Sequence, residues 1–290
     1  MSILSKARDL VRQAVLPEEI RKLGEDDIGS FAVDEARLLY HDGRRTLFLR
    51  EEVSPEVLAR SLAYNVALKT RSIEHEHRVP LGASKVKGLP HLPPGMKWPA
   101  GQYFAAQLRL ADFHPHDLEA VFPASGVVYF FFDPGSDCSA LYYDGPLDAL
   151  KITPYPEGLP DVEVYLDEFM AQSARLTFEP GYLFYLGGGG AYDYREIAKR
   201  IPADLRASLD GLLGCKLKEW DSGLRIFGRP LYWQGEDEVW PDDEGDGDDS
   251  EPEVLLLQSE FGEGHIHFWG APAKTSRGDF SGVWMSYSGT

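Results

Sequence analysis

The spacing of apolar residues predicts a mainly helical region over residues 1–78. Behind Ser2 an apolar residue recurs every three or four positions, as on a helix with one buried face: Ile3, Leu4, Ala7, Leu10, Val11 and Val15. A short second helix is expected from Pro17, because proline suits the first helical position and acids follow it. Ser54 before Pro55 predicts a third helix, continuing to about Thr70.

From residue 79 to residue 290 the composition changes to proline, glycine and aromatic residues, and the pattern becomes that of strands. We expect strands at residues 103–110, 127–132, 141–143, 175–178, 182–186, 224–232, 254–258, 264–269 and 282–287. Residues 194–213 predict two helical pieces, separated at Pro202. The fold class is therefore α+β, with a β-rich body and an N-terminal helical layer.

Two stretches of this body repeat one pattern. A Gly-x-Pro, a Trp-Pro and a glutamine occur twice in the same order: Gly88-x-Pro90, Trp98-Pro99 and Gln107, then Gly228-x-Pro230, Trp240-Pro241 and Gln258. A basic–apolar pair precedes each copy, Lys85-Val86 and Arg225-Ile226. The pattern predicts an internal duplication, with halves at about residues 80–150 and 220–290. We expect Trp98 and Trp240 to be buried anchors of the core, although stacking on a ligand is the alternative.

Charge and composition narrow the classes of function. The 47 acidic and 29 basic side chains give a net charge of −18, which makes nucleic acids and anionic membranes poor partners and favours a cationic protein partner. No apolar run is long enough to span a membrane, so we expect a cytoplasmic protein. Cys138 and Cys215 are far apart and favour two free thiols, although one disulfide stays possible.

The densest charge lies between residues 242 and 251. Seven of these ten residues are acidic, and we predict that they bind the partner: Asp242, Asp243, Glu244, Asp246, Asp248, Asp249 and Glu251. The segment matches a calcium loop only in part, because Asp249 stands where that loop has an aliphatic residue and Pro252 interrupts its end. A solvated, partner-steering loop is the preferred interpretation.

Three His-x-His pairs raise the alternative of a metal-dependent hydrolase: His75/His77, His114/His116 and His265/His267. A metal site needs three or four ligands that converge, and no further ligand stands at a suitable spacing. The chain also lacks the Gly-x-Ser-x-Gly, Walker and His-Glu-x-x-His motifs. We therefore predict no catalytic residue, metal ligand or cofactor, and favour a non-enzymatic protein.

Several ordered motifs resemble the YwqG-like family over about residues 80–290. They are Ser84-Lys85-Val86-x-Gly88-x-Pro90, Trp98-Pro99, Phe104-Ala-Ala-Gln107, Gly126-x-x-Tyr-Phe-Phe-Phe-Asp133, Leu255-Leu-Leu-Gln258, Gly264-x-Ile-x-Phe268 and Asp279-Phe280-Ser-x-Val283-Trp284. The resemblance implies a bacterial β-rich duplicated domain that in some settings is the immunity partner of a polymorphic or secreted toxin. The chain departs from the family at the helical N-terminal region, the acidic segment, and His265 and His267.

Taken with the charge, this resemblance predicts a cytoplasmic immunity protein. Its acidic surface would steer a cationic toxin, for example a nuclease, into encounter and occlude the basic groove of that toxin.

Overall fold

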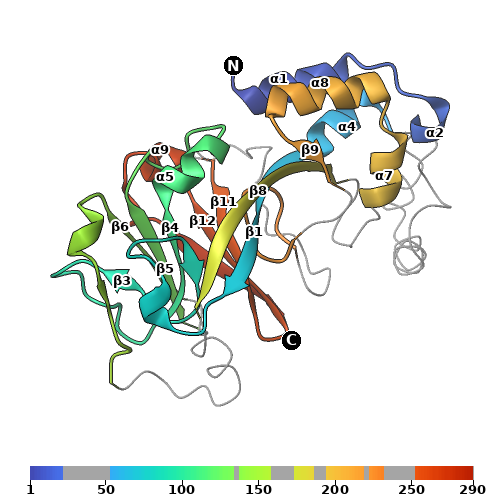
Figure 1. Ribbon diagram of the computed structural model, residues 1–290. Helices are drawn as coiled ribbons and strands as arrows, with labels where there is room; N and C mark the ends of the chain where they lie inside the picture. The colour runs from blue at the N-terminus through green and yellow to red at the C-terminus, as the bar shows by residue number, and fades with distance from the viewer. Residues whose placement is uncertain are drawn as a thin grey trace. The chain divides into compact units, whose positions relative to one another are not determined.

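A computed structural model describes residues 1–21, 53–133, 137–157, 173–185, 194–218, 222–231 and 252–289 (Figure 1). The chain divides into two compact units. The main segments of the first, the helical unit, are Met1–Asn65 and Pro180–Ser222. The second, the β unit, consists of Val66–Glu179, Gly223–Trp233 and Val239–Thr290.

Local signals in the sequence mark where helices of the helical unit begin. The described helices of this unit are α1 (Ile3–Arg12), α2 (Glu18–Arg21), α4 (Pro55–Ser61), α7 (Tyr194–Arg200) and α8 (Ala203–Leu213). The hydroxyl oxygen of Ser2 accepts the Ser5 N–H at 3.1 Å, and that of Ser54 accepts the Val57 N–H at 3.2 Å. Helix α1 packs against α4 and α8. The predicted helix starts and the break at Pro202 are confirmed.

The prediction that the third helix continues to Thr70 is wrong. The helix ends at Ser61, and strand β1 (Leu62–Ser72) follows directly. Every residue from Tyr64 to Leu68 is buried, because β1 lies between β8 and β10 inside the sheet and packs on both faces. Apart from Asn65, the residues from Leu62 to Leu68 are apolar, and periodicity does not distinguish such a run in a buried strand from a buried helix.

One long sheet dominates the β unit. Its order is β13-β12-β11-β10-β1-β8-β2-β4-β5-β6, and β13 also lies near β6, so the sheet is nearly closed. The strands are β2 (Lys85–Val86), β4 (Tyr103–Arg109), β5 (Val127–Asp133), β6 (Asp137–Tyr143), β8 (Ala174–Phe184), β10 (Arg225–Ile226), β11 (Val254–Phe261), β12 (Gly264–Gly270) and β13 (Trp284–Gly289). A separate pair joins β3 (His91–Leu92) to β7 (Lys151–Ile152).

The two strands predicted at residues 175–178 and 182–186 are one strand. Pro180 and Gly181 interrupt the sequence pattern but not β8, because Gly181 pairs there with Lys216 of the short parallel strand β9 (Lys216–Leu217). The remaining strand predictions match β4, β5, β6, β11, β12 and β13 to within a few residues, except that of the strand predicted at residues 224–232 the described residues form only the two-residue β10.

Aromatic side chains fill the interior of the β unit. One cluster of buried residues consists of Leu92, Phe104, Val127, Tyr129, Phe131 and Leu150. Trp98 lies at the edge of this cluster, with its ring 5.3 Å from those of Phe131 and Tyr155, and it is only half-buried. Its predicted role as a core anchor is met in part, and Trp240 lies outside the described residues. None of the described helices is long and apolar enough to cross a membrane.

Candidate functional site

A buried glutamine fastens a turn in the first half of the β unit. Gln107 lies opposite Lys85 in the β2–β4 pair and is fully buried. Its Oε1 accepts the His91 N–H at 2.8 Å, and its Nε2 donates to the Ala83 carbonyl at 2.8 Å. On the neighbouring strand, the Tyr129 hydroxyl donates to the His91 carbonyl at 2.7 Å. The turn between β2 and β3 is thus held by side chains of β4 and β5.

The second half carries the same set of bonds. Gln258 lies opposite Arg225 in the β10–β11 pair; its Oε1 accepts the Leu231 N–H at 2.8 Å, and its Nε2 donates to the Gly223 carbonyl at 3.0 Å. His267 takes the place of Tyr129, with Nε2 at 3.1 Å from the Leu231 carbonyl. The repeated sequence pattern therefore corresponds to a repeated pattern of hydrogen bonds.

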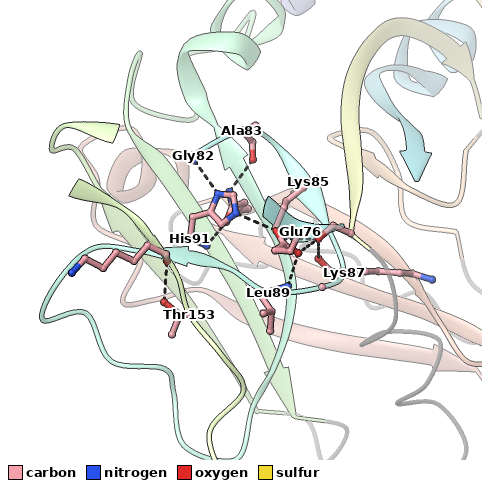
Figure 2. Close-up of polar contacts among 12 residues, drawn as sticks. Glu76, Gly82, Ala83, Lys85, Lys87, Leu89, His91 and Thr153 are labelled. Carbon is pink, nitrogen blue, oxygen red and sulfur yellow. Dashed lines mark hydrogen bonds and ion pairs between the residues drawn. The ribbon is translucent and has the colours of Figure 1, made fainter. Parts of the chain in front are cut away.

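A cluster of polar side chains adjoins the turn of the first half only, as far as the described residues show. We call Glu76, Lys85, His91 and Ser173 the Glu76 cluster (Figure 2). Glu76 comes from the 3-10 helix η2 (Glu76–Arg78), Lys85 from β2, His91 from β3, and Ser173 immediately precedes β8. The cluster therefore joins segments that are up to 97 residues apart in the chain.

The Glu76 carboxylate is the centre of this cluster. Its Oε1 accepts from Lys85 Nζ at 2.5 Å and lies 3.1 Å from His91 Nε2. Its Oε2 accepts the Leu89 N–H at 3.2 Å and the Ser173 hydroxyl. Lys85 Nζ also donates to Ser173 Oγ at 2.8 Å. Four donors from separate segments therefore converge on a single carboxylate, as Figure 2 shows for Lys85, Leu89 and His91.

The hydrogen bonds of His91 define its tautomer. Its Nδ1 accepts the Gly82 N–H at 3.1 Å and therefore carries no hydrogen. The hydrogen must be on Nε2, which donates to Glu76. His91 is fully buried as a neutral donor, so the one countercharge that the cluster gives to Glu76 is Lys85.

Burial and hydrogen bonding act in opposite directions on the charges of the cluster. Burial raises the pKa of Glu76, but the hydrogen bonds from His91, Lys85 and Ser173 outweigh it and lower the pKa to about 2. Burial lowers the pKa of Lys85 to about 8, against the hydrogen bond and the charge of Glu76. At neutral pH the two groups therefore form an ion pair with a fully buried ammonium.

Gly88 of the first Gly-x-Pro leaves room for the cluster. Its φ is +65°, in the left-handed region that favours glycine. A Cβ at this position would lie 2.1 Å from Ser173 Oγ and 2.7 Å from Glu76 Oε2. The glycine is thus required both by its backbone conformation and by the close approach of two side chains.

The bonds of the cluster fasten separate segments of the β unit to one another. The Ser173 hydroxyl donates to the Glu76 carboxylate, and its Oγ accepts from Lys85 Nζ at 2.8 Å, so the hydroxyl is held within the cluster as donor and as acceptor. Lys85, His91 and Ser173 are also buried. Glu76 and Ser173 belong to none of the predicted sites, and Lys85 was expected only as a marker of the repeat. The available signal was the basic residue of the repeated basic–apolar pair, which begins the two-residue strand β2.

The predicted partner-binding residues, Asp242 to Glu251, lie outside the described residues. The predicted histidine pairs are described. The rings of His75 and His77 stack at 5.4 Å, His114 and His116 belong to a short 3-10 helix, and His265 and His267 are neighbours on β12 at 6.3 Å. Within the described part of the chain, no group of three or more histidine, cysteine or acidic side chains could hold a metal ion.

Both cysteines are free thiols. Cys215 is buried and Cys138 is half-buried. Burial raises the pKa of each thiol to about 12, which disfavours the reactive thiolate at neutral pH.

Fold and site together define a β-rich protein with a nearly closed sheet whose turns are fastened by buried amide side chains. A family model described as "Domain of unknown function (DUF1963)" matches residues 84–288. The chain belongs to this family. No curated protein matches the chain. The matched residues include both copies of the repeated pattern and exclude α1, α2 and α4.

Proposed function

We propose that the protein is a non-enzymatic binding protein whose partner is a cationic protein. The observation that carries this proposal is the net charge of −18. Such a surface attracts a basic partner over distances of about a Debye length, roughly 8 Å at physiological ionic strength. The Glu76 cluster adds support, because its polar groups bond to one another and Lys85, His91 and Ser173 are buried.

The specific role we propose is that of a cytoplasmic immunity protein for a secreted toxin. The acidic residues from Asp242 to Glu251 steer the toxin into encounter and cover its basic groove, as the polyanionic substrate of a nuclease would. The resemblance to the YwqG-like family supports the immunity role. The net charge of −18 supports the proposed steering of a basic toxin.

We also propose that the β unit consists of two related halves and that the N-terminal helices form a layer of their own. Strand order supports the first point, because β2-β4-β5-β6 on one side of β1 and β8 corresponds to β10-β11-β12-β13 on the other. Phe130 and Phe268, which occupy equivalent places on β5 and β12, contact each other with ring centroids 5.1 Å apart. Two equivalent residues in contact are typical of packing about an approximate two-fold axis.

The test of the binding role uses the protein encoded beside this gene as the candidate partner. Asp242, Asp243, Asp246, Asp248 and Asp249 are changed together to asparagine, and association is measured by surface plasmon resonance over a range of salt concentrations. We expect slower association and a weaker dependence on salt, with an unchanged melting temperature. Cells that express both proteins should lose protection in proportion to the lost affinity.

A matched control removes the same charge elsewhere. Five exposed acids of the β unit, Asp112, Glu119, Asp144, Asp148 and Glu157, are changed to their amides. If both variants associate equally slowly, total charge rather than residues 242–251 is responsible. If the intact chain neither binds the neighbouring protein nor protects cells against it, the immunity role is wrong.

A further inference from the structure

The turns at His91 and Leu231 are held by equivalent hydrogen bonds. Of the described side chains that make these bonds, His267 is the one histidine. It is fully buried, with Nε2 at 3.1 Å from the Leu231 carbonyl and Nδ1 at 3.4 Å from Ser286 Oγ. A carbonyl only accepts, so Nε2 must carry the hydrogen, and Nδ1 is left to accept from the Ser286 hydroxyl. Ser286 Oγ already accepts from Trp269 Nε1 at 3.2 Å, so a neutral imidazole that accepts the Ser286 hydrogen fits this pattern of bonds.

The first half makes the equivalent bond with a group that does not take up a proton. There the Tyr129 hydroxyl donates to the His91 carbonyl at 2.7 Å. Phenol and imidazole are both satisfactory donors, but only imidazole gains a charge between neutral and mildly acidic pH. The two halves therefore hold equivalent turns with donors of different sensitivity to acid.

The described groups around His267 disfavour a positive charge. On its own strand, His265 lies 6.3 Å away between ring centroids. Strand β10 contributes the buried Arg225, while β11 and β13 present the uncharged Gln258 and Ser286. Burial chiefly lowers the pKa of His267, to about 3, and the charges of His265 and Arg225 add to it against the bond to Leu231.

We propose that His267 is an acid-sensitive latch on the second half of the β unit, which holds the turn at Leu231 while its imidazole is neutral and releases that turn as the medium becomes acidic. The closed turn keeps the imidazole unprotonated, whereas an open turn exposes it to water with its ordinary affinity for protons. The stabilisation of the closed turn by the neutral imidazole is therefore complete above about pH 6.5 and decreases as the pH falls. This latch does not depend on the proposed partner.

The opening is measured at one backbone amide. The Leu231 N–H donates to Gln258 Oε1, so its hydrogen exchange reports whether the turn is closed. Exchange is followed by NMR from pH 7 to pH 4.5 and corrected for the intrinsic rate. With one proton taken up on opening, the opening equilibrium should increase by up to about tenfold per pH unit.

Three variants isolate the imidazole. His267→Gln and His267→Tyr keep a hydrogen-bond donor at this position but remove the imidazole that takes up a proton. In both variants the opening equilibrium at Leu231 should lose the increase of up to about tenfold per pH unit. His265→Gln, on the same strand, should keep the dependence of the native protein. All groups other than the substituted side chain are the same in these proteins, so only the difference between variants is assigned to His267.

Equal pH dependence in the native protein and in His267→Gln would overturn the latch. So would a flat profile in His265→Gln combined with a steep one in His267→Gln. A measurement on the native chain avoids any failure of the variants to fold. The ring nitrogens of His267 should report the neutral Nε2–H tautomer down to pH 5, and an imidazolium with Leu231 still protected at pH 6 would contradict the proposal.

Discussion

The turns at His91 and Leu231 carry the same hydrogen bonds from side chains to the backbone but have different polar neighbours. In each, a buried glutamine bridges an N–H and a carbonyl, and a donor from the next strand holds the following carbonyl. Beside His91 lies the carboxylate of Glu76 with its four donors. At Leu231 the donor from the next strand is the imidazole of His267, where the turn at His91 has the phenol of Tyr129. The shared bonds fix the backbone path, and the side chains that differ set how each turn responds to charge and pH.

The largest expected effect is on the Glu76 cluster. Glu76→Ala leaves the ammonium of Lys85 buried without a countercharge, which should lower the free energy of unfolding by about 3–5 kcal/mol in urea denaturation at pH 7. The control is Glu74→Ala on the same segment, since Glu74 is exposed and its ion pairs are long, at 3.8 and 3.9 Å. We expect that control to cost less than about 1 kcal/mol. Similar losses in both variants would contradict the cluster's role.

The acid limb of stability gives an independent check of Glu76. Its pKa is lowered from the ordinary value of 4.5 to about 2 in the folded protein, so the unfolded chain binds the extra proton between these values. The stabilisation is complete above about pH 4.5 and is lost as the pH falls toward 2. In Glu76→Gln this part of the pH dependence should disappear. An unchanged acid limb would show that Glu76 is not ionised in the fold.

The two glutamines test whether the halves are alike in energy. Gln107→Leu leaves the His91 N–H and the Ala83 carbonyl without their hydrogen-bond partner, and Gln258→Leu does the same to the equivalent groups. Each substitution should lower the free energy of unfolding by about 2–4 kcal/mol. Gln102→Leu is the control, because the buried Oε1 of Gln102 has no partner among the described residues. Gln102→Leu should change the free energy of unfolding little. A large loss at Gln107 with almost none at Gln258 would contradict the comparison.

Glycine at position 88 separates backbone strain from steric conflict. Gly88 and Gly95 both have positive φ, +65° and +88°, but a Cβ at Gly95 would meet nothing within 4 Å. Alanine at either site strains the backbone, whereas Gly88→Ala also pushes against Ser173. Thermal or urea unfolding should therefore show Gly88→Ala to be less stable than Gly95→Ala by about 1–3 kcal/mol. Equal losses would mean that the cluster moves aside without cost.

The smallest expected effect is at Tyr129. Tyr129→Phe removes the donor to the His91 carbonyl and keeps the ring, so it should cost about 1 kcal/mol, measured by urea unfolding. Tyr142→Phe is the control, because that hydroxyl donates to the Ser125 carbonyl at a more exposed site. If the two variants lose the same stability, the bond to His91 contributes no more than a surface bond.

Local signals in the sequence determined the helix starts and the repeated pattern. Ser2 and Ser54 cap their helices through residues three positions away, and Pro202 separates α7 from α8. The Gly-x-Pro and glutamine of each copy mark the turns that carry the shared bonds. The helix starts depend on neighbours within a few residues, and the repeat depends on a pattern that recurs along the chain. Both kinds of feature can be recognised from the sequence without a structure.

Tertiary structure alone decided the nature of Leu62–Ser72 and the partners of Glu76. The apolar run after Ser61 is compatible with helix or strand, and its place between β8 and β10 selects the strand. Glu76 and Ser173 carry no motif, and they meet because β1, which ends shortly before Glu76, lies beside β8 in the sheet, where the Ile73 N–H donates to the Ser173 carbonyl at 2.8 Å. Contacts between residues nearly a hundred positions apart depend on how the strands pair, which the spacing of residues along the chain does not specify.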